Sequence, residues 1–285
     1  MEYMKKTLFV LFLLLFSPIV CAEDINIKGS DTIVRLTQRL AEVYMKDHPQ
    51  VKIAVSGGGS GVGIAAIINQ TADIADASRE MKAKELEGAA RKNVSPKKVV
   101  IAADAIAIIV NERNPVRTLT TDELGAVFRG EITNWKKLGG LDMPVTLYGR
   151  QSTSGTYVFL RDLVVKADYS PRMAGLQGNA GIMEAVKADQ SGIGFVGVAF
   201  IRKAEGVSPL MIAASKDHPY LSPLDKDVVE SGAYPLTRPL IQYIDAHSRP
   251  EVHGFIAFEL SSDGQKVIEE EGFFQIPLSW KTRLH

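Results

Sequence analysis

Cysteine is almost absent from this 285-residue sequence: the only one, Cys21, lies in an apolar N-terminal segment. Residues 23–285 contain no cysteine, so they can form no disulfide. A chain of this length can instead bury a large hydrophobic core, in one large domain or in two lobes.

An excess of charge of one sign is also absent, because 33 lysines and arginines balance 33 aspartates and glutamates. Nucleic-acid-binding proteins usually carry a basic excess, which argues against that class. The histidines show no metal-ligand spacing, and we expect neither a metal nor a cofactor. A Walker loop and a Gly-x-Gly-x-x-Gly dinucleotide motif are missing too. The histidines are His48, His218, His247, His253 and His285.

The N-terminal segment, residues 1–22, has the pattern of a signal peptide. Lys5 and Lys6 precede an apolar run over residues 7–20, and Val20-Cys21-Ala22 resembles a cleavage site. The run is short for a membrane span. We expect export to the periplasm or outside the cell, with cleavage after Ala22. The alternative is a lipid anchor on Cys21, but the lipidation motif expects a small residue at the position of Val20.

Strand and helix patterns alternate along the rest of the chain, as is typical of an α/β fold with a mainly parallel sheet. Apolar runs predict buried strands over residues 99–110, 193–200 and 236–244. The first of these is either one long strand or a strand pair with a bend at Asp104. Periodic apolar residues predict one long helix over residues 251–272.

Two of these strands, 99–110 and 193–200, are suited to cross between two lobes. We therefore expect lobe 1 to contain residues 23–105 and 208–285, and lobe 2 to contain residues 106–207. The ligand is expected in the cleft between the lobes, beyond the carboxyl ends of the strands.

Three loops rich in Ser, Thr and Gly each join a predicted strand to a predicted helix, at residues 29–32, 56–63 and 149–156. A helix N-terminus offers backbone N–H groups and a partial positive charge, which suit an oxyanion. In the third loop the Arg150 guanidinium adds two charged donors. Independent helix caps are the alternative explanation, because Ser and Thr are common cap residues.

Six motifs, taken in order, resemble one known family, the periplasmic phosphate-binding protein of the Pst-type ABC transporter. The resemblance covers residues 25–277 and implies a two-lobed type II periplasmic-binding-protein fold that closes on one phosphate. The motifs are Lys-Gly-Ser-Asp-Thr (28–32), Gly-Gly-Ser-Gly-Val-Gly (58–63), Ala-Asp-Ile-Ala-Asp-Ala-Ser-Arg (72–79), Ile-Thr-Asn-Trp (132–135), Gly-Arg-Gln-Ser-Thr-Ser-Gly-Thr (149–156) and Ser-Gly-Ile-Gly-Phe-Val (191–196).

The resemblance also implies which residues bind phosphate. The expected ligands are Ser30, Asp31, Thr32, Ser60, Ser78, Arg150, Ser154, Gly155 and Thr156. Further candidates are Gly59, Gly61, Asp76, Arg79 and Ser152. Some family members place an Asp where this chain has Ser78, and that Asp accepts the proton of hydrogen phosphate. Asp31 and Asp76 are the candidates for that role here.

The function implied is a non-catalytic receptor that passes inorganic phosphate to a membrane permease, and we expect a monomer. A receptor of the same fold for sulfate, molybdate or tungstate is one alternative. A secreted phosphatase is another, but neither a Gly-x-Ser-x-Gly elbow nor a metal cluster supports it. A sensor or adhesion protein that retains the fold but binds weakly is the last.

Overall fold

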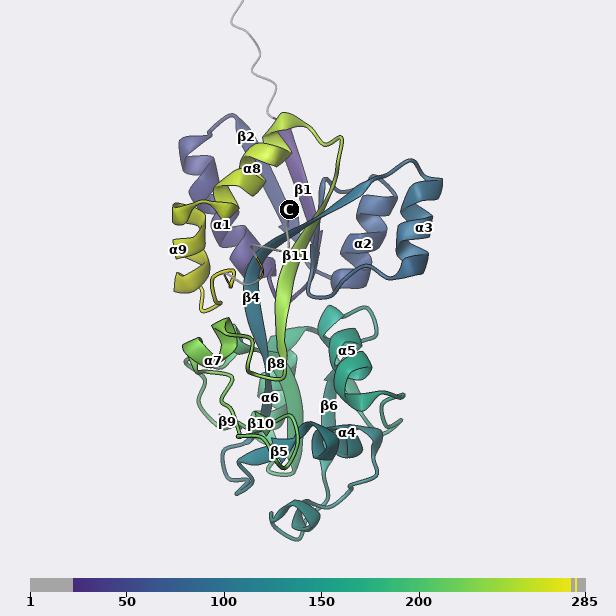
Figure 1. Ribbon diagram of the computed structural model, residues 1–285, viewed down its shortest axis with the longest axis vertical. Coiled ribbons are helices and arrows are strands. Elements are labelled where there is room, and N and C mark those ends of the chain that lie inside the picture. Colours follow the sequence, from purple (N-terminus) through teal and green to yellow (C-terminus); the bar gives the residue numbers. More distant parts are fainter. Residues whose placement is uncertain (1–22, 278–279, 281–285) are drawn as a thin grey trace, which may run out of the picture.

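One long strand, β4 (Pro96–Asn111), runs through both halves of the molecule. The computed structural model describes residues 23–277 and 280, and the predicted signal peptide with Cys21 lies outside the described residues. The first part of β4 pairs with β11 (Thr237–Asp245) in the upper lobe of Figure 1. Its last part pairs with β8 (Gly192–Gly197) in the lower lobe. The expected two-lobed α/β fold is confirmed, and β4 is one continuous strand rather than a bent pair. The sheet is mixed rather than mainly parallel, because β4 is antiparallel to β8, β9 and β11.

Lobe 1, the upper lobe, is built on a sheet with the order β2-β1-β3-β11-β4. Strand β1 is parallel to β2 and β3, whereas β11 is antiparallel to β3 and β4. Helices α1, α8 and α9 lie on one side of this sheet and α2 and α3 on the other (Figure 1). The elements are β1 (Glu23–Gly29), α1 (Val34–Asp47), β2 (Val51–Ser56), α2 (Ser60–Ile68), β3 (Ile74–Ala77), α3 (Ala83–Arg91), α8 (Pro250–Leu260) and α9 (Ser262–Glu270).

The two faces of the lobe 1 sheet bury separate apolar clusters. Leu36 and Leu40 recur at helical spacing on α1 and pack with Phe255 of α8. On the other face, Ile64 and Ile67 of α2 pack against β3 and β11. Among the described residues, none of the helices is both long enough and apolar enough to span a membrane.

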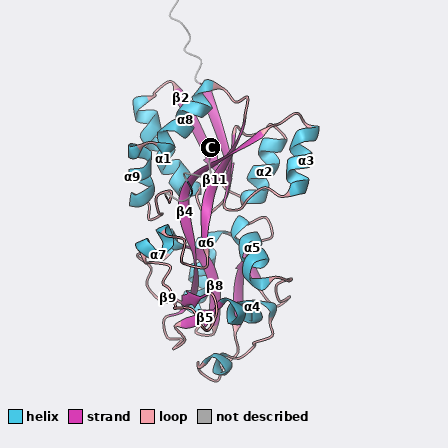
Figure 2. Cartoon of the chain, in the orientation of Figure 1, coloured by secondary structure: helices cyan, strands magenta, loops and turns pink. Residues whose placement is uncertain are grey.

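Lobe 2, the lower lobe, continues the sheet through β8, β6 and β7, with helices around it (Figure 2). Its core includes Phe128, Phe195 and Trp135, whose indole N–H donates to the Ser191 carbonyl at 2.8 Å. The elements are β5 (Thr118–Thr120), α4 (Thr121–Arg129), η1 (Trp135–Leu138), β6 (Thr146–Arg150), α5 (Gly155–Leu160), the π-helix η2 (Arg161–Val165), β7 (Ala174–Leu176), α6 (Gly178–Ala188), η3 (Val198–Phe200), β9 (Val207–Pro209), β10 (Met211–Ala213) and α7 (Lys226–Glu230).

The chain returns to lobe 1 later than residue 208. Strand β9 pairs with β4 inside lobe 2, and Ile212 and Tyr234 are buried in the lobe 2 core. The second crossing is therefore the start of β11, where Thr237 pairs with Ala105 of β4. Lobe 2 extends to about residue 236. The apolar residues of a segment predict that the segment is buried, but they do not specify which lobe buries it.

Two further elements differ from the sequence prediction. The strand expected over residues 193–200 ends at Gly197, and η3 follows it at the boundary between the lobes. The single helix expected over residues 251–272 is divided into α8 and α9 at Ser261. The Ser261 hydroxyl accepts the Gly264 N–H at 3.2 Å and caps the second helix.

Candidate functional site

The three predicted loops meet where the two lobes touch. Residues 29–32 begin with the last residue of β1, and residues 56–63 run from the last residue of β2 into α2. Residues 149–156 run from the end of β6 into α5 of the other lobe. The N–H of Gly61 in lobe 1 donates to the Thr153 carbonyl of lobe 2 at 3.0 Å. The hydroxyls of Thr32 and Thr156 lie 3.2 Å apart across the same boundary. The loops therefore form one site that both lobes share.

Three serine hydroxyls gather on the lobe 1 side of this site. The Ser78 hydroxyl lies 3.0 Å from that of Ser30 and 3.3 Å from that of Ser60, and the Ser78 N–H donates to the Ser60 hydroxyl at 3.0 Å. All three residues are buried. Each comes from a different strand-to-helix connection, so the cluster depends on the parallel arrangement of β1, β2 and β3.

Gly155 of lobe 2 sits directly against this serine cluster. A Cβ atom at Gly155 would lie 2.3 Å from the Ser60 hydroxyl and 2.5 Å from the Ser78 hydroxyl. Only glycine permits so close an approach of the lobe 2 backbone. The neighbouring Ser154 and Thr156 are also buried, and the Ser154 hydroxyl accepts the Tyr157 N–H at 3.4 Å.

Arg150, the last residue of β6, is the charged group that lobe 2 contributes. Its Nη2 donates to the Asp31 carboxylate of lobe 1 at 2.6 Å, and the other Asp31 oxygen accepts the Gly58 N–H at 2.7 Å. The Nε and Nη1 of Arg150 are buried without a hydrogen-bond partner. Burial lowers the pKa of Arg150, the Asp31 charge opposes this, and the charge of Arg238 adds to it.

Arg238 is a second guanidinium in this site, and it lies outside the sequence motifs that predicted the site. It donates to the Thr156 hydroxyl at 3.0 Å, to the Thr32 hydroxyl at 3.4 Å and to the Ser78 carbonyl at 3.3 Å. Its Nε and Nη2 donate to the Asp104 carboxylate at 3.0 and 2.7 Å. The one signal available was Asp104, an acidic residue inside the apolar run of residues 99–110 that requires a buried partner.

Several predicted candidates have their polar groups engaged elsewhere or lie at the surface. Arg79 makes two bonds to the Glu85 carboxylate, at 2.7 and 2.8 Å, near the start of α3. The Gly61 N–H is used by the Thr153 carbonyl, as described above. Gly59 has a φ of 95° and packs against the Thr153 carbonyl, so it shapes the loop. Ser152 is exposed.

The Asp76 carboxylate also points away from the three loops, into the interior of lobe 1. It accepts the Thr37 hydroxyl at 2.8 Å and the Gln242 amide at 3.0 Å. Burial raises the pKa of Asp76 from 3.8 to about 7, and both hydrogen bonds oppose this. The same Gln242 amide donates to Glu259 at 3.1 Å, and burial raises the pKa of Glu259 well above its usual value. Only the Asp76 carbonyl reaches the site, where it accepts the Ser30 N–H at 2.9 Å.

Beside the site, a cleft of about 450 Å³ opens between the lobes. Thr32 links it to the hydroxyl groups described above, and Arg35, Arg202 and Lys203 line it together with Glu271. The Arg202 Nε donates to the Gly272 carbonyl at 2.6 Å and so connects the two lobes.

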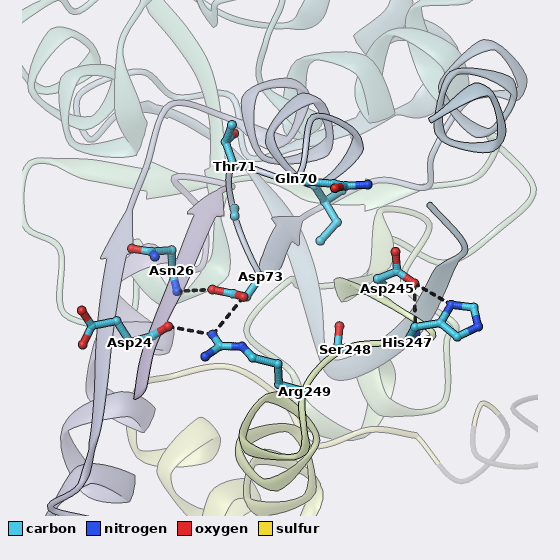
Figure 3. A pocket seen from close by; sticks show the side chains of 11 residues that line it. Asp24, Asn26, Gln70, Thr71, Asp73, Asp245, His247, Ser248 and Arg249 are labelled. Carbon is cyan, nitrogen blue, oxygen red and sulfur yellow. Dashed lines mark hydrogen bonds and ion pairs between the residues drawn. The ribbon is translucent and has the colours of Figure 1, made fainter. Parts of the chain in front are cut away.

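Figure 3 shows another pocket, of about 490 Å³, at the opposite end of the lobe 1 strands. Its charged groups bond to one another. Arg249 donates to the Asp73 carboxylate at 3.0 Å and to the Asp24 carbonyl at 2.7 Å, and His247 bonds to Asp245. This pocket therefore has fewer free hydrogen-bond donors for an anion than the site at the lobe boundary, where two Arg150 nitrogens have no partner.

The chemistry of the boundary site is that of a cage of hydrogen-bond donors. Its donors are hydroxyls, backbone N–H groups and two guanidiniums, and a guanidinium can only donate. The Asp31 carboxylate, bonded to Arg150, is an acceptor in the same site. Within residues 23–277 and 280, no group of three or more His, Cys, Asp or Glu side chains could hold a metal ion. The described histidines are exposed or half-buried.

Comparison with known proteins agrees with this arrangement. A family model described as a PBP superfamily domain matches residues 21–263. The phosphate-binding protein PstS of Pseudomonas aeruginosa is 30% identical over 267 residues, covering 87% of this chain and 82% of the relative. That of Borreliella burgdorferi is 27% identical over 288 residues, covering 96% of this chain and 99% of the relative.

Solved structures show the same similarity. A substrate-binding protein from Clostridium perfringens, crystallised with bound phosphate, has a TM-score of 0.80 and 26% identity, covering 89% of this chain and all of that one. An ABC-type phosphate transport receptor from Vibrio cholerae has a TM-score of 0.72 and 29% identity, covering 88% and 99%.

Proposed function

This chain belongs to the phosphate-binding protein family of ABC-type phosphate importers, a family of receptors rather than enzymes, and from that premise we propose that it binds inorganic phosphate between its two lobes. The bound phosphate is then passed to a membrane permease. The comparisons support the receptor class, and the geometry of the lobe boundary supports the place of binding.

The observation that carries the proposal is the state of Arg150. Its side chain is 2% exposed, and Nε and Nη1 have no hydrogen-bond partner. Leaving buried charged donors unsatisfied is unfavourable by several kcal/mol, on the order of 1–3 kcal/mol for each group. An oxyanion bound beside Arg150 would give Nη1 or Nε a charged acceptor, and such charge-assisted hydrogen bonds are stronger than neutral ones.

The surrounding residues would supply the remaining donors. The Ser78 hydroxyl bonds to the hydroxyls of Ser30 and Ser60, and a phosphate oxygen can replace both contacts with stronger, charge-assisted ones. From lobe 2, Ser154 and Thr156 would contribute hydroxyls, and Gly155 would allow its backbone to approach the ligand.

Asp31 is the carboxylate best placed to distinguish phosphate from sulfate. It belongs to the same site through its bond to Arg150, whereas the Asp76 side chain faces the lobe interior. Phosphate near neutral pH carries a proton that a carboxylate can accept, and sulfate does not. Facing sulfate, Asp31 would remain a carboxylate beside an anion, which is unfavourable.

The receptor would act outside the cytoplasm. The signal-peptide pattern of residues 1–22 supports export and cleavage after Ala22, and a lipid anchor on Cys21 is the alternative. The intact mass of the exported protein distinguishes the two outcomes. A chain that begins at Glu23 supports cleavage, and a chain that retains an acylated Cys21 refutes it.

Calorimetric titration of the mature protein with phosphate, sulfate and molybdate tests the binding proposal. We expect one phosphate per chain with micromolar or tighter affinity. Arg150→Ala should weaken binding by at least about tenfold, because a charge-assisted hydrogen bond contributes about 1.5–3 kcal/mol. Arg249→Ala is the matched control, because Arg249 lies in the pocket of Figure 3. Absence of phosphate binding would refute the function, and wild-type affinity of Arg150→Ala would refute the site.

A further inference from the structure

We propose that Arg238 is a positioning residue that orients the hydroxyls of Thr32 and Thr156 so that they donate to the bound anion. The inference rests on the proposed function but goes beyond the family motifs, because Arg238 belongs to none of the six. It assigns selectivity for anions to a residue outside the three site loops.

The position of Arg238 suits this role. It is the second residue of β11, beside the point where the chain crosses back to lobe 1. From there it reaches Thr32 and the Ser78 carbonyl in lobe 1 and Thr156 in lobe 2. One guanidinium therefore contacts both lobes of the site.

Asp104 holds the Arg238 guanidinium in place. Both side chains are 0% exposed, and two Arg238 nitrogens donate to one Asp104 oxygen. The other Asp104 oxygen accepts the Val198 N–H at 3.2 Å. A guanidinium anchored in this way has a fixed orientation, and its Nη1 and Nη2 remain directed at the two threonines.

The direction of these hydrogen bonds determines how the threonine hydroxyls can act. A hydroxyl has one proton and two lone pairs, and arginine cannot accept a hydrogen bond. The oxygens of Thr32 and Thr156 must therefore accept from Arg238, and their protons must point elsewhere. One proton can be shared across the 3.2 Å contact between the two hydroxyls, and the other is left to donate to a ligand oxygen. Without Arg238, either hydroxyl could turn and present a lone pair to the anion.

The charge balance of the site fits the same inference. The Asp104 carboxylate neutralises the charge of Arg238, and the Asp31 carboxylate neutralises that of Arg150. Neither arginine therefore adds an unpaired positive charge to the site. Arg238 thus acts through the hydroxyls it polarises, and Arg150 acts through its two unmet donors. Removing Arg238 should affect the anion through Thr32 and Thr156 and not directly.

A double-mutant cycle tests this inference, with phosphate affinity measured by calorimetry. Arg238→Lys retains the charge beside Asp104 but cannot reach both threonines, and we expect a loss of affinity of about fivefold to thirtyfold. In a Thr32→Val, Thr156→Val background the same change should have less than a twofold effect, because the hydroxyls it orients are gone. An equal loss in both backgrounds would overturn the proposal, because a general structural role predicts additivity.

Two controls make every outcome informative. Arg249→Lys changes an arginine–aspartate pair remote from the site and should leave affinity unchanged. If Arg238→Lys does not fold, the neutral pair Arg238→Gln with Asp104→Asn replaces it, and thermal melting verifies that variant. Failure of the wild-type protein to bind phosphate would refute the proposed function, whereas normal wild-type binding with an unaffected Arg238→Lys variant would refute only the role of Arg238.

Discussion

The buried carboxyl group of Asp76 makes a specific prediction about stability and pH. Asp76 is 1% exposed, and its side chain bonds only to the neutral groups of Thr37 and Gln242. Burial raises its pKa in the folded protein to about 7, against 3.8 for the unfolded chain. The folded state therefore binds the proton more tightly. Its contribution to stability is fully present below about pH 4 and is lost as the pH rises through 7.

The size of the effect follows from the same two values. They differ by roughly three pKa units, and each unit corresponds to about 1.4 kcal/mol. The whole loss is on the order of 4 kcal/mol, of which about 2–3 kcal/mol falls between pH 5 and pH 8. The neighbouring Glu259, whose pKa is raised well above its usual value, acts in the same direction.

Urea unfolding between pH 5 and pH 8 measures this loss directly. We expect the free energy of unfolding to fall with rising pH in the wild-type protein and to fall much less in Asp76→Asn, which carries no ionisable group there. Asp142→Asn, an exposed member of a surface ion pair in lobe 2, is the control and should retain the wild-type slope. An unchanged slope in Asp76→Asn would show that the buried carboxyl group is not responsible.

Three other outcomes are expected. Gly155→Ala should weaken phosphate binding by about 1–3 kcal/mol in calorimetry, because its Cβ would meet the Ser60 and Ser78 hydroxyls; wild-type affinity would refute this close contact. Asp31→Asn should raise sulfate affinity relative to phosphate in competition titrations, and an unchanged ratio would remove Asp31 from the selectivity argument. Solution scattering should show a smaller radius of gyration with saturating phosphate, as the lobes close; identical curves would argue against closure.

The overall fold was predictable because its signals are local. Alternating apolar strands and amphipathic helices indicated an α/β chain, and strand-to-helix joints indicated loops at the carboxyl ends of parallel strands. The boundary of lobe 2 was not predictable in the same way. Ile212 and Tyr234 look like core residues in either lobe, and only the pairing of β9 with β4 places their segment in lobe 2.

The site was predictable only to the extent that its residues lie in short motifs. Ser60, Arg150 and Thr156 belong to such motifs, and the structure brings them to one lobe boundary. Arg238 lies 134 residues from Asp104, and only the adjacency of β4 and β11 in the sheet brings the two together. The direction of the Asp76 side chain depends on strand orientation, which the motif containing it does not specify.

The crossing of β4 and β11 also makes lobe 2 a single continuous module of the chain. Because Ala105 and Thr237 are paired neighbours, lobe 2 is one uninterrupted insertion, residues 106–236, between adjacent points of lobe 1. Arg150, Ser154 and Thr156 all lie in that insertion, and the three serines of lobe 1 all lie before it. Exchanging this single segment with that of a relative would replace one half of the anion cage and leave the other half intact. The lobe 1 half and the lobe 2 half of the cage can then change separately, because the two junctions near Ala105 and Thr237 lie side by side in the fold.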